Sequence, residues 1–150
     1  MEHKETFINE AIEEVTASSK DSTIYVGCDS NRFRKKGNWF ASYATVVIVH
    51  KGSKHGCKVV GDVIVLPDYG NLRQRLFQEV MFATDCAMQI NDAVGDRNLE
   101  VHLDINTEEQ HKSSIAVKEA IGYVLGMGFK PKVKPEAFAA SSCADHYCRI

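Results

Sequence analysis

The spacing of hydrophobic residues predicts several helices along the chain. Residues 3–18 and, most clearly, residues 71–91 carry apolar side chains every three or four positions, which is the spacing of an amphipathic helix. Residues 107–126 are predicted to form a third helix, with Thr107 as its N-cap and Gly126 at its end. A terminal helix is expected over about residues 138–148, where small residues dominate.

The strands are predicted from runs of β-branched and aromatic residues between turn-forming segments. The first run begins at Thr23 and ends in Asp29-Ser30, and residues 31–38 are expected to form a polar, basic turn that contains Gly37. Further strands are expected over residues 39–50, 57–66, 99–104 and 129–133, with Pro67 ending the third strand.

The order of these elements predicts an α/β fold. Tight turns join antiparallel strands and helical crossovers join parallel ones, so the order α, β, β, β, α, β, α, β, α indicates a five-stranded mixed sheet flanked by helices, with three antiparallel strands followed by two parallel ones. A length of 150 residues favours a single domain over residues 1–150, in which residues 1–20 form an N-terminal helical extension.

Composition excludes several classes of protein. A hydrophobic content of 44% and a charged content of 25% are ordinary for globular proteins and argue against disorder. The net charge of -2 excludes a globally basic protein, so any contact with nucleic acid must use a local patch or a metal. No apolar stretch approaches the roughly 18 residues of a membrane span, and the N-terminus is charged, so we expect a cytoplasmic protein without membrane contact.

Cysteine usage favours reduced thiols, because five scattered cysteines do not form the even, dense set of a disulfide framework. Cys143 and Cys148 flank His146, which raises the alternative of a zinc site. The C-x2-C spacing of such sites is missing, so small buried side chains are the favoured interpretation.

Two aspartates follow apolar strands and are the first candidates for chemistry. Asp29 ends the first strand and Asp104 ends the fourth. If these strands are parallel neighbours, about 4.8 Å apart, their carboxylates emerge side by side at the carboxyl edge of the sheet, where open α/β sheets place their sites. An isolated aspartate at a strand end is more often a turn former or helix cap, so it is the pair that points to a cation.

Two further acids lie on predicted helices. A helical wheel over residues 71–91 places Glu79 beside the buried stripe and Asp85 on the opposite, solvated side. The alternative for Glu79 is a buried salt bridge to Arg73 or Arg75. Asp145 lies among small residues in AASSCADHYC, and an exposed position is its alternative.

Carboxylates without a matching His/Cys set suit Mg²⁺ or Mn²⁺. Two such ions about 3.5 to 4 Å apart stabilise the attacking and leaving oxygens of phosphodiester hydrolysis. A phosphate-cradling Gly-rich loop is missing from the sequence, which disfavours a nucleotide-binding ATPase-like protein.

Three segments carry a resemblance to a known family. YVGCDSN, HLDIN and KPKVKPEAFAASSCADHYC resemble the YkuK-like family of ribonuclease-H-like proteins, and the element order after residue 22 is similar to that of the ribonuclease H superfamily. The resemblance implies a two-metal nuclease acting on RNA, DNA or their hybrid, with Asp29 and Asp104 as central ligands. It also implies that Glu79 and Asp145 complete the two ion sites.

Basic residues near these acids are expected to contact substrate phosphates. The expected contacts are Ser30, Arg32, Arg34, Lys35 and Lys36 around the first turn, and Lys130, Lys132 and Lys134 before the last helix. Solvated surface is the alternative for each basic turn, since the first turn lacks the stacking aromatics of a single-strand platform apart from Phe33 and Trp39. The rival function is a ribonuclease H-like module that binds nucleic acid or a protein without cutting it.

Overall fold

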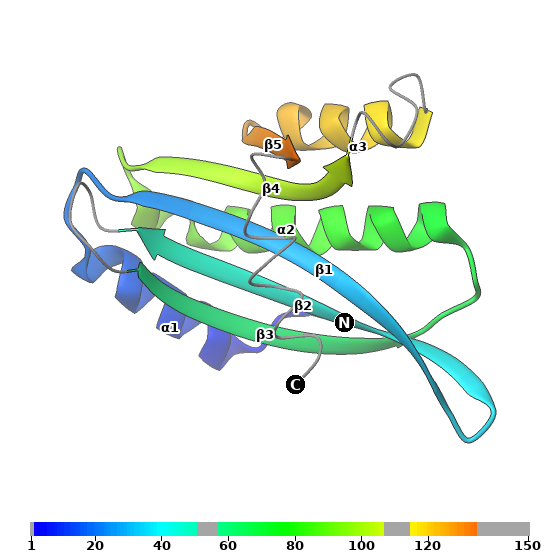
Figure 1. Cartoon of the computed structure of the whole chain (residues 1–150). Helices are drawn as coiled ribbons and strands as arrows, with labels where there is room; N and C mark the ends of the chain where they lie inside the picture. The colour runs from blue at the N-terminus through cyan, green and yellow to red at the C-terminus, as the bar shows by residue number, and fades with distance from the viewer. Residues whose placement is uncertain (1, 51–56, 107–114, 135–150) are drawn as a thin grey trace.

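The computed structural model describes residues 2–50, 57–106 and 115–134, which form a five-stranded sheet and three helices (Figure 1). In chain order the elements are α1 (Glu5–Ala17), β1 (Thr23–Lys35), β2 (Asn38–His50), β3 (Cys57–Pro67), α2 (Leu72–Val94), β4 (Asn98–Asn106), α3 (Ile115–Gly126) and β5 (Lys130–Lys134). The strand order across the sheet is β3-β2-β1-β4-β5.

The pairing of the strands confirms the predicted mixed sheet. β2 pairs antiparallel with both β1 and β3, whereas β4 pairs parallel with both β1 and β5. α2 connects the end of the antiparallel part to β4, and α3 connects β4 to β5. β1 therefore lies at the centre of the sheet, between the antiparallel and the parallel parts.

The hairpin between β1 and β2 is longer than the sequence predicts. The expected turn over residues 31–38 is wrong, because β1 continues to Lys35 and the turn consists of Lys36 and Gly37. Both turn residues have positive φ, 51° and 80°, as a two-residue turn with the twist of a hairpin requires. Cross-strand pairs hold the polar strand ends together, including Phe33 stacked on Phe40 with centroids 5.7 Å apart.

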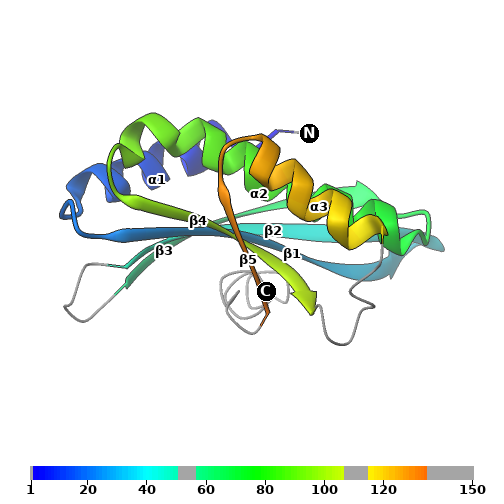
Figure 2. The same ribbon diagram turned by 90° about the horizontal axis from the view of Figure 1, so that it is seen from above.

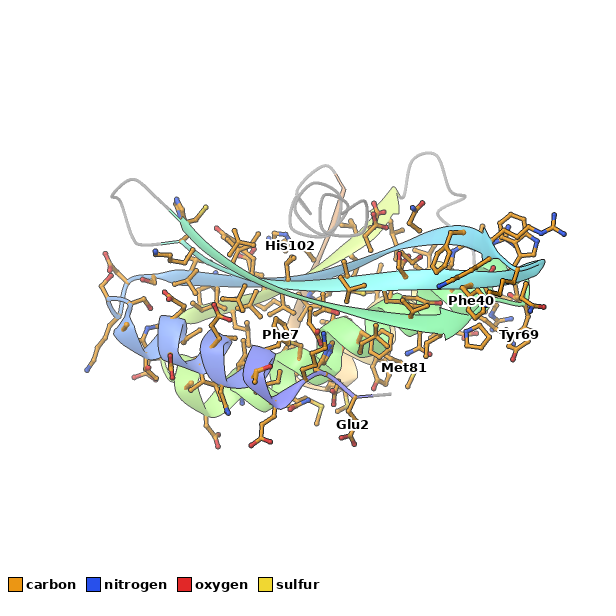
Figure 3. All side chains as sticks on the ribbon, turned by 90° about the horizontal axis from the view of Figure 1, so that it is seen from below. Glu2, Phe7, Phe40, Tyr69, Met81 and His102 are labelled. Atoms are coloured by element: carbon orange, nitrogen blue, oxygen red, sulfur yellow. The ribbon has the colours of Figure 1, made fainter. Side chains whose placement is uncertain are left out.

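The described helices lie on one face of the sheet and enclose the main core (Figure 2). α2 buries Val80, Ala83, Ala87 and Ile90 against this face, as its periodicity predicts. A smaller apolar cluster of Ala44, Val46 and Ile48 lies on the opposite face, together with Tyr25. Figure 3 shows the two sides, with Phe7 among the helices and His102 across the sheet.

The N-terminal segment is tied to α2 and β3 by a buried polar group. His3 Nε2 lies 3.0 Å from the carbonyl oxygen of Phe82 and therefore donates its proton to it, while Nδ1 lies 3.5 Å from Asp62. The backbone N–H of Lys4 also donates to Asp62 at 3.2 Å. These contacts fix the start of α1, and the periodicity of the sequence gives no sign of them.

Several predictions concern residues outside the described part of the chain. They are the N-cap Thr107, the terminal helix over residues 138–148, and Cys143, His146 and Cys148. Within the described ranges, Cys28, Cys57 and Cys86 are not joined in disulfides. A search of the described helices finds none with the length and apolar character of a membrane span.

Candidate functional site

The register between β1 and β4 brings Asp29 and Asp104 to matching positions. The parallel pairing runs from Thr23 opposite Asn98 to Gly27 opposite His102, and each aspartate lies two residues beyond this last pair. The condition set by the sequence, that the two strands are parallel neighbours, is therefore met. Asp29 is buried and Asp104 is partly buried.

The alternation along each strand shows to which face these residues belong. Val26 and Cys28 of β1 contribute to the core under the helices, whereas Tyr25 packs with the cluster on the opposite face. Asp29 is in phase with Tyr25, and Asp104 is in phase with His102, whose ring lies 4.9 Å from that of Tyr25. Both aspartates thus belong to the face opposite α2, just beyond the last β1–β4 pair.

Glu79 approaches the same corner from α2. It is partly buried, and its carboxylate accepts a hydrogen bond from the hydroxyl of Ser30, the residue after Asp29. The pKa of Glu79 is raised to about 8. Burial is the main cause, and the charges of Asp29 and Asp104 contribute to the rise. Three carboxylates from three separate elements therefore lie within electrostatic range of one another; we call Asp29, Glu79 and Asp104 the acidic corner.

The alternative of a buried salt bridge for Glu79 is not what the structure shows. Arg73 binds Glu119 at 2.9 Å near the surface, and Arg75 lies 3.9 Å from Asp68. Neither arginine forms an ion pair with Glu79 among the described side chains. Arg75 lowers the pKa of Glu79, but less than burial and the two aspartates raise it.

The donor set of the acidic corner fits a hard divalent cation. Its ligand atoms are carboxylate oxygens, which Mg²⁺ and Mn²⁺ prefer, and a cation would offset both the burial and the repulsion that raise the pKa of Glu79. Within residues 2–50, 57–106 and 115–134, no three acidic, histidine or cysteine side chains already surround one common ion position. The fourth predicted ligand, Asp145, lies outside the described residues.

The predicted phosphate contacts occupy different environments. The Ser30 hydroxyl is held by Glu79. Arg32 donates to Asp68 and lies over the ring of Trp39, 4.4 Å from its centroid, and Arg34 lies 5.8 Å from the same centroid. Lys35 is exposed at the end of β1.

The lysines of β5 run beside β4. Lys134 pairs with Asn106 at the carboxyl end of that strand, and Lys132 pairs with His102. Lys130 donates to the side chain of Asn98 at 2.9 Å and so lies at the opposite end of the pairing. Asp104 therefore lies between the pairs that Lys132 and Lys134 form with β4, where the register shifts.

The sequence interpretation missed one further carboxylate, which lies near the acidic corner. Asp68, directly after β3, has a side chain that is 5% exposed and is contacted by both Arg32 and Arg75. Tyr43 lies beside it, and burial together with the charges of Glu79 and Asp68 raises the pKa of Tyr43 to about 12. Arg32 lies 36 residues from Asp68 along the chain, and the Pro-Asp-Tyr-Gly context of Asp68 indicates a turn and nothing more.

Comparison with known proteins places the chain in a family. A YkuK protein of Bacillus subtilis (strain 168), described as uncharacterized, is 24% identical over 141 residues, covering 84% of this chain and 78% of that protein. The crystal structure of prototype foamy virus protease-reverse transcriptase aligns with a TM-score of 0.47 and 11% identity, over 86% of this chain and 20% of that one, so the chain spans a fifth of its length. The model of the ribonuclease H-like family matches residues 6–149. The protein therefore belongs to the ribonuclease H-like family.

Proposed function

We propose that this protein is a metal-dependent nuclease that hydrolyses phosphodiester bonds of RNA or DNA by a two-metal-ion mechanism. The observation that carries the proposal is the acidic corner, where Asp29, Glu79 and Asp104 from β1, α2 and β4 lie within electrostatic range of one another. Such crowding of like charges is costly unless a cation is bound.

The residues of the corner would hold two divalent ions. Asp29 and Asp104 are proposed as the central ligands, and Glu79 and Asp145 as the residues that complete the two sites. When bound, the ions supply an activated water nucleophile and stabilise the attacking and leaving oxygens of the scissile phosphate. The backbone N–H of Ser30 donates to Asp29 at 2.9 Å and its hydroxyl donates to Glu79, so one residue orients two ligands.

Basic residues around the corner are proposed to bind the substrate backbone. Arg34 and Lys35 extend along the hairpin from β1, and Lys134 ends the strand next to β4. Arg32 is oriented by Asp68 and Trp39, which fixes its position beside the path to the corner. Ser30 is proposed to contact substrate as well as to position Glu79.

Cleavage assays with matched variants test this function. The protein is incubated with labelled RNA/DNA hybrid, single-stranded and branched substrates in Mg²⁺ or Mn²⁺, beside Asp29→Asn, Asp104→Asn and the control Asp85→Asn. Asp85 is exposed on α2 and bonds to Gln89, away from the corner. We expect the first two variants to lose about a hundredfold or more of the cleavage rate and the control to keep it.

The opposite result would assign the protein to the rival class. Two outcomes would contradict the proposed two-metal nuclease. One is binding of nucleic acid with no metal-dependent cleavage of any substrate, and the other is cleavage that persists in both Asp29→Asn and Asp104→Asn. The first of these outcomes favours a non-catalytic ribonuclease H-like module.

A further inference from the structure

A cavity of about 400 Å³ lies between the N-terminal half of α2 and the end of β3. We propose that it binds one unpaired nucleobase of the nucleic acid whose backbone lies at the acidic corner. This inference rests on the proposed function and adds the form of the substrate, a single-stranded or locally unpaired one.

The walls of the cavity have the chemistry that a nucleobase requires. Tyr43, Tyr69 and Phe77 offer aromatic surface for stacking, and Gln74 and Gln78 offer amide donors and acceptors for the polar edge of a base. A volume of this size lies within the usual range of small-ligand sites. The combination of flat aromatic rings and neutral amides suits a planar, polar heterocycle better than an aliphatic chain.

The cavity lies beside Glu79, the residue of the acidic corner that comes from α2. Tyr43 and Arg75 line it, and both lie within electrostatic range of Glu79. A nucleotide with its base in the cavity would therefore have its sugar and phosphate close to Glu79, one of the proposed metal ligands. Arg75 belongs to both places, which makes it the side chain that would bridge base and backbone.

The charges around the cavity favour a nucleic acid as the occupant. Asp68 in its wall is held between Arg32 and Arg75, and Arg32 continues onto the ring of Trp39. Among the lining residues the charges of Arg75 and Asp68 balance each other, and Arg32, bound to Asp68 outside the lining, adds one positive charge beside them for a phosphate. Ion pairing also fixes both arginines before a ligand arrives, which lowers the entropy lost on binding.

The mouth of the cavity faces solvent, so a base can enter without a rearrangement of the fold. Tyr69 is 84% exposed and stands at its rim, on the same side of the sheet as Met81 (Figure 3). A base stacked within a duplex cannot reach such a recess unless it leaves the stack. The expected substrate therefore presents at least one unpaired nucleotide beside the scissile bond.

Nuclear magnetic resonance titration of the metal-free protein tests the inference without cleavage. Adenosine 5′-monophosphate is expected to give saturable shifts at the backbone amides of residues 66–81, whereas ribose 5-phosphate, which lacks the base, is expected to leave them unshifted. Tyr69→Ala and Gln74→Ala alter exposed side chains of the wall and should weaken binding roughly fivefold or more each. Gln89→Ala, an exposed glutamine on the same helix outside the cavity, is the control and should bind normally.

The results separate this inference from the proposed function. Three outcomes would overturn the base site, even if metal-dependent cleavage is observed. They are equal shifts with ribose 5-phosphate, no shifts with the nucleotide, and unchanged affinity in both Tyr69→Ala and Gln74→Ala. Base-dependent shifts that the two variants weaken support the site, even if no substrate is cleaved; the nuclease alone then fails.

Discussion

Asp68 and the acidic corner lie close together in this fold, and the surroundings of their carboxylates differ. Asp68 is almost fully buried but is contacted by Arg32 and Arg75, so its charge is compensated within the protein. At the acidic corner, Glu79 has Ser30 as its hydrogen-bond donor, and burial together with the charges of Asp29 and Asp104 raises its pKa to about 8 in spite of the charge of Arg75. Burial of a single acid therefore does not mark a site, whereas acids from several elements that lie within electrostatic range of one another do.

The largest effect on stability is expected when the charge of Asp68 is removed. Asp68→Asn removes the negative charge that Arg32 and Arg75 share and leaves two cations close together. We expect the free energy of unfolding to fall by roughly 1–3 kcal/mol, as for the loss of a hydrogen-bonded charge. Urea denaturation measures it, with Asp85→Asn, an exposed helix acid, expected within about 0.5 kcal/mol of the parent. Equal stability of the two variants would remove the contrast between the two groups.

An effect of opposite sign is expected at Glu79. Its raised pKa means that the folded protein binds a proton more tightly than the unfolded chain, so ionisation between about pH 5 and pH 8 destabilises the fold. Glu79→Gln lacks this ionisation and should become more stable than the parent as pH rises through that window. Thermal unfolding in chelator measures the difference, and 1 kcal/mol corresponds to about 2–4 °C in Tm for a protein of this size. Parallel pH profiles for the two proteins would contradict an uncompensated Glu79.

The smallest effect is the pH dependence of stabilisation by Mg²⁺. A cation at the acidic corner displaces the proton from Glu79, so the rise in Tm with Mg²⁺ should be larger at pH 8.5 than at pH 6.5. Glu79→Gln should lose this increment, while Asp68→Asn should keep it from a lower starting Tm. An increment that persists in Glu79→Gln would place the ion elsewhere.

Much of the fold follows from periodicity and connection rules. The mixed sheet, the parallel neighbours β1 and β4 and the inward position of Glu79 were all predictable, because each depends on spacing within one segment or on the handedness and length of a connection. The continuation of β1 to Lys35 was not, since Asn31 to Lys35 are polar enough to resemble a turn, and their strand pairing is fixed by partners on β2.

Contacts between distant segments set the limit of prediction from sequence. The Asp68–Arg32–Arg75 group joins three elements, and the cavity beside it is formed where β3 ends against α2. Nothing in the local sequence around Asp68 distinguishes it from a turn aspartate. The fourth predicted ligand, Asp145, and the metal ions themselves stay predictions.

The most direct test is a crystal of the protein grown or soaked in Mn²⁺ and measured for anomalous scattering. We expect anomalous peaks about 2.0–2.2 Å from carboxylate oxygens of Asp29 and Asp104, with Glu79 coordinating at least one of the ions. Anomalous density absent from this corner at saturating Mn²⁺, or present solely at other surface acids, would contradict it.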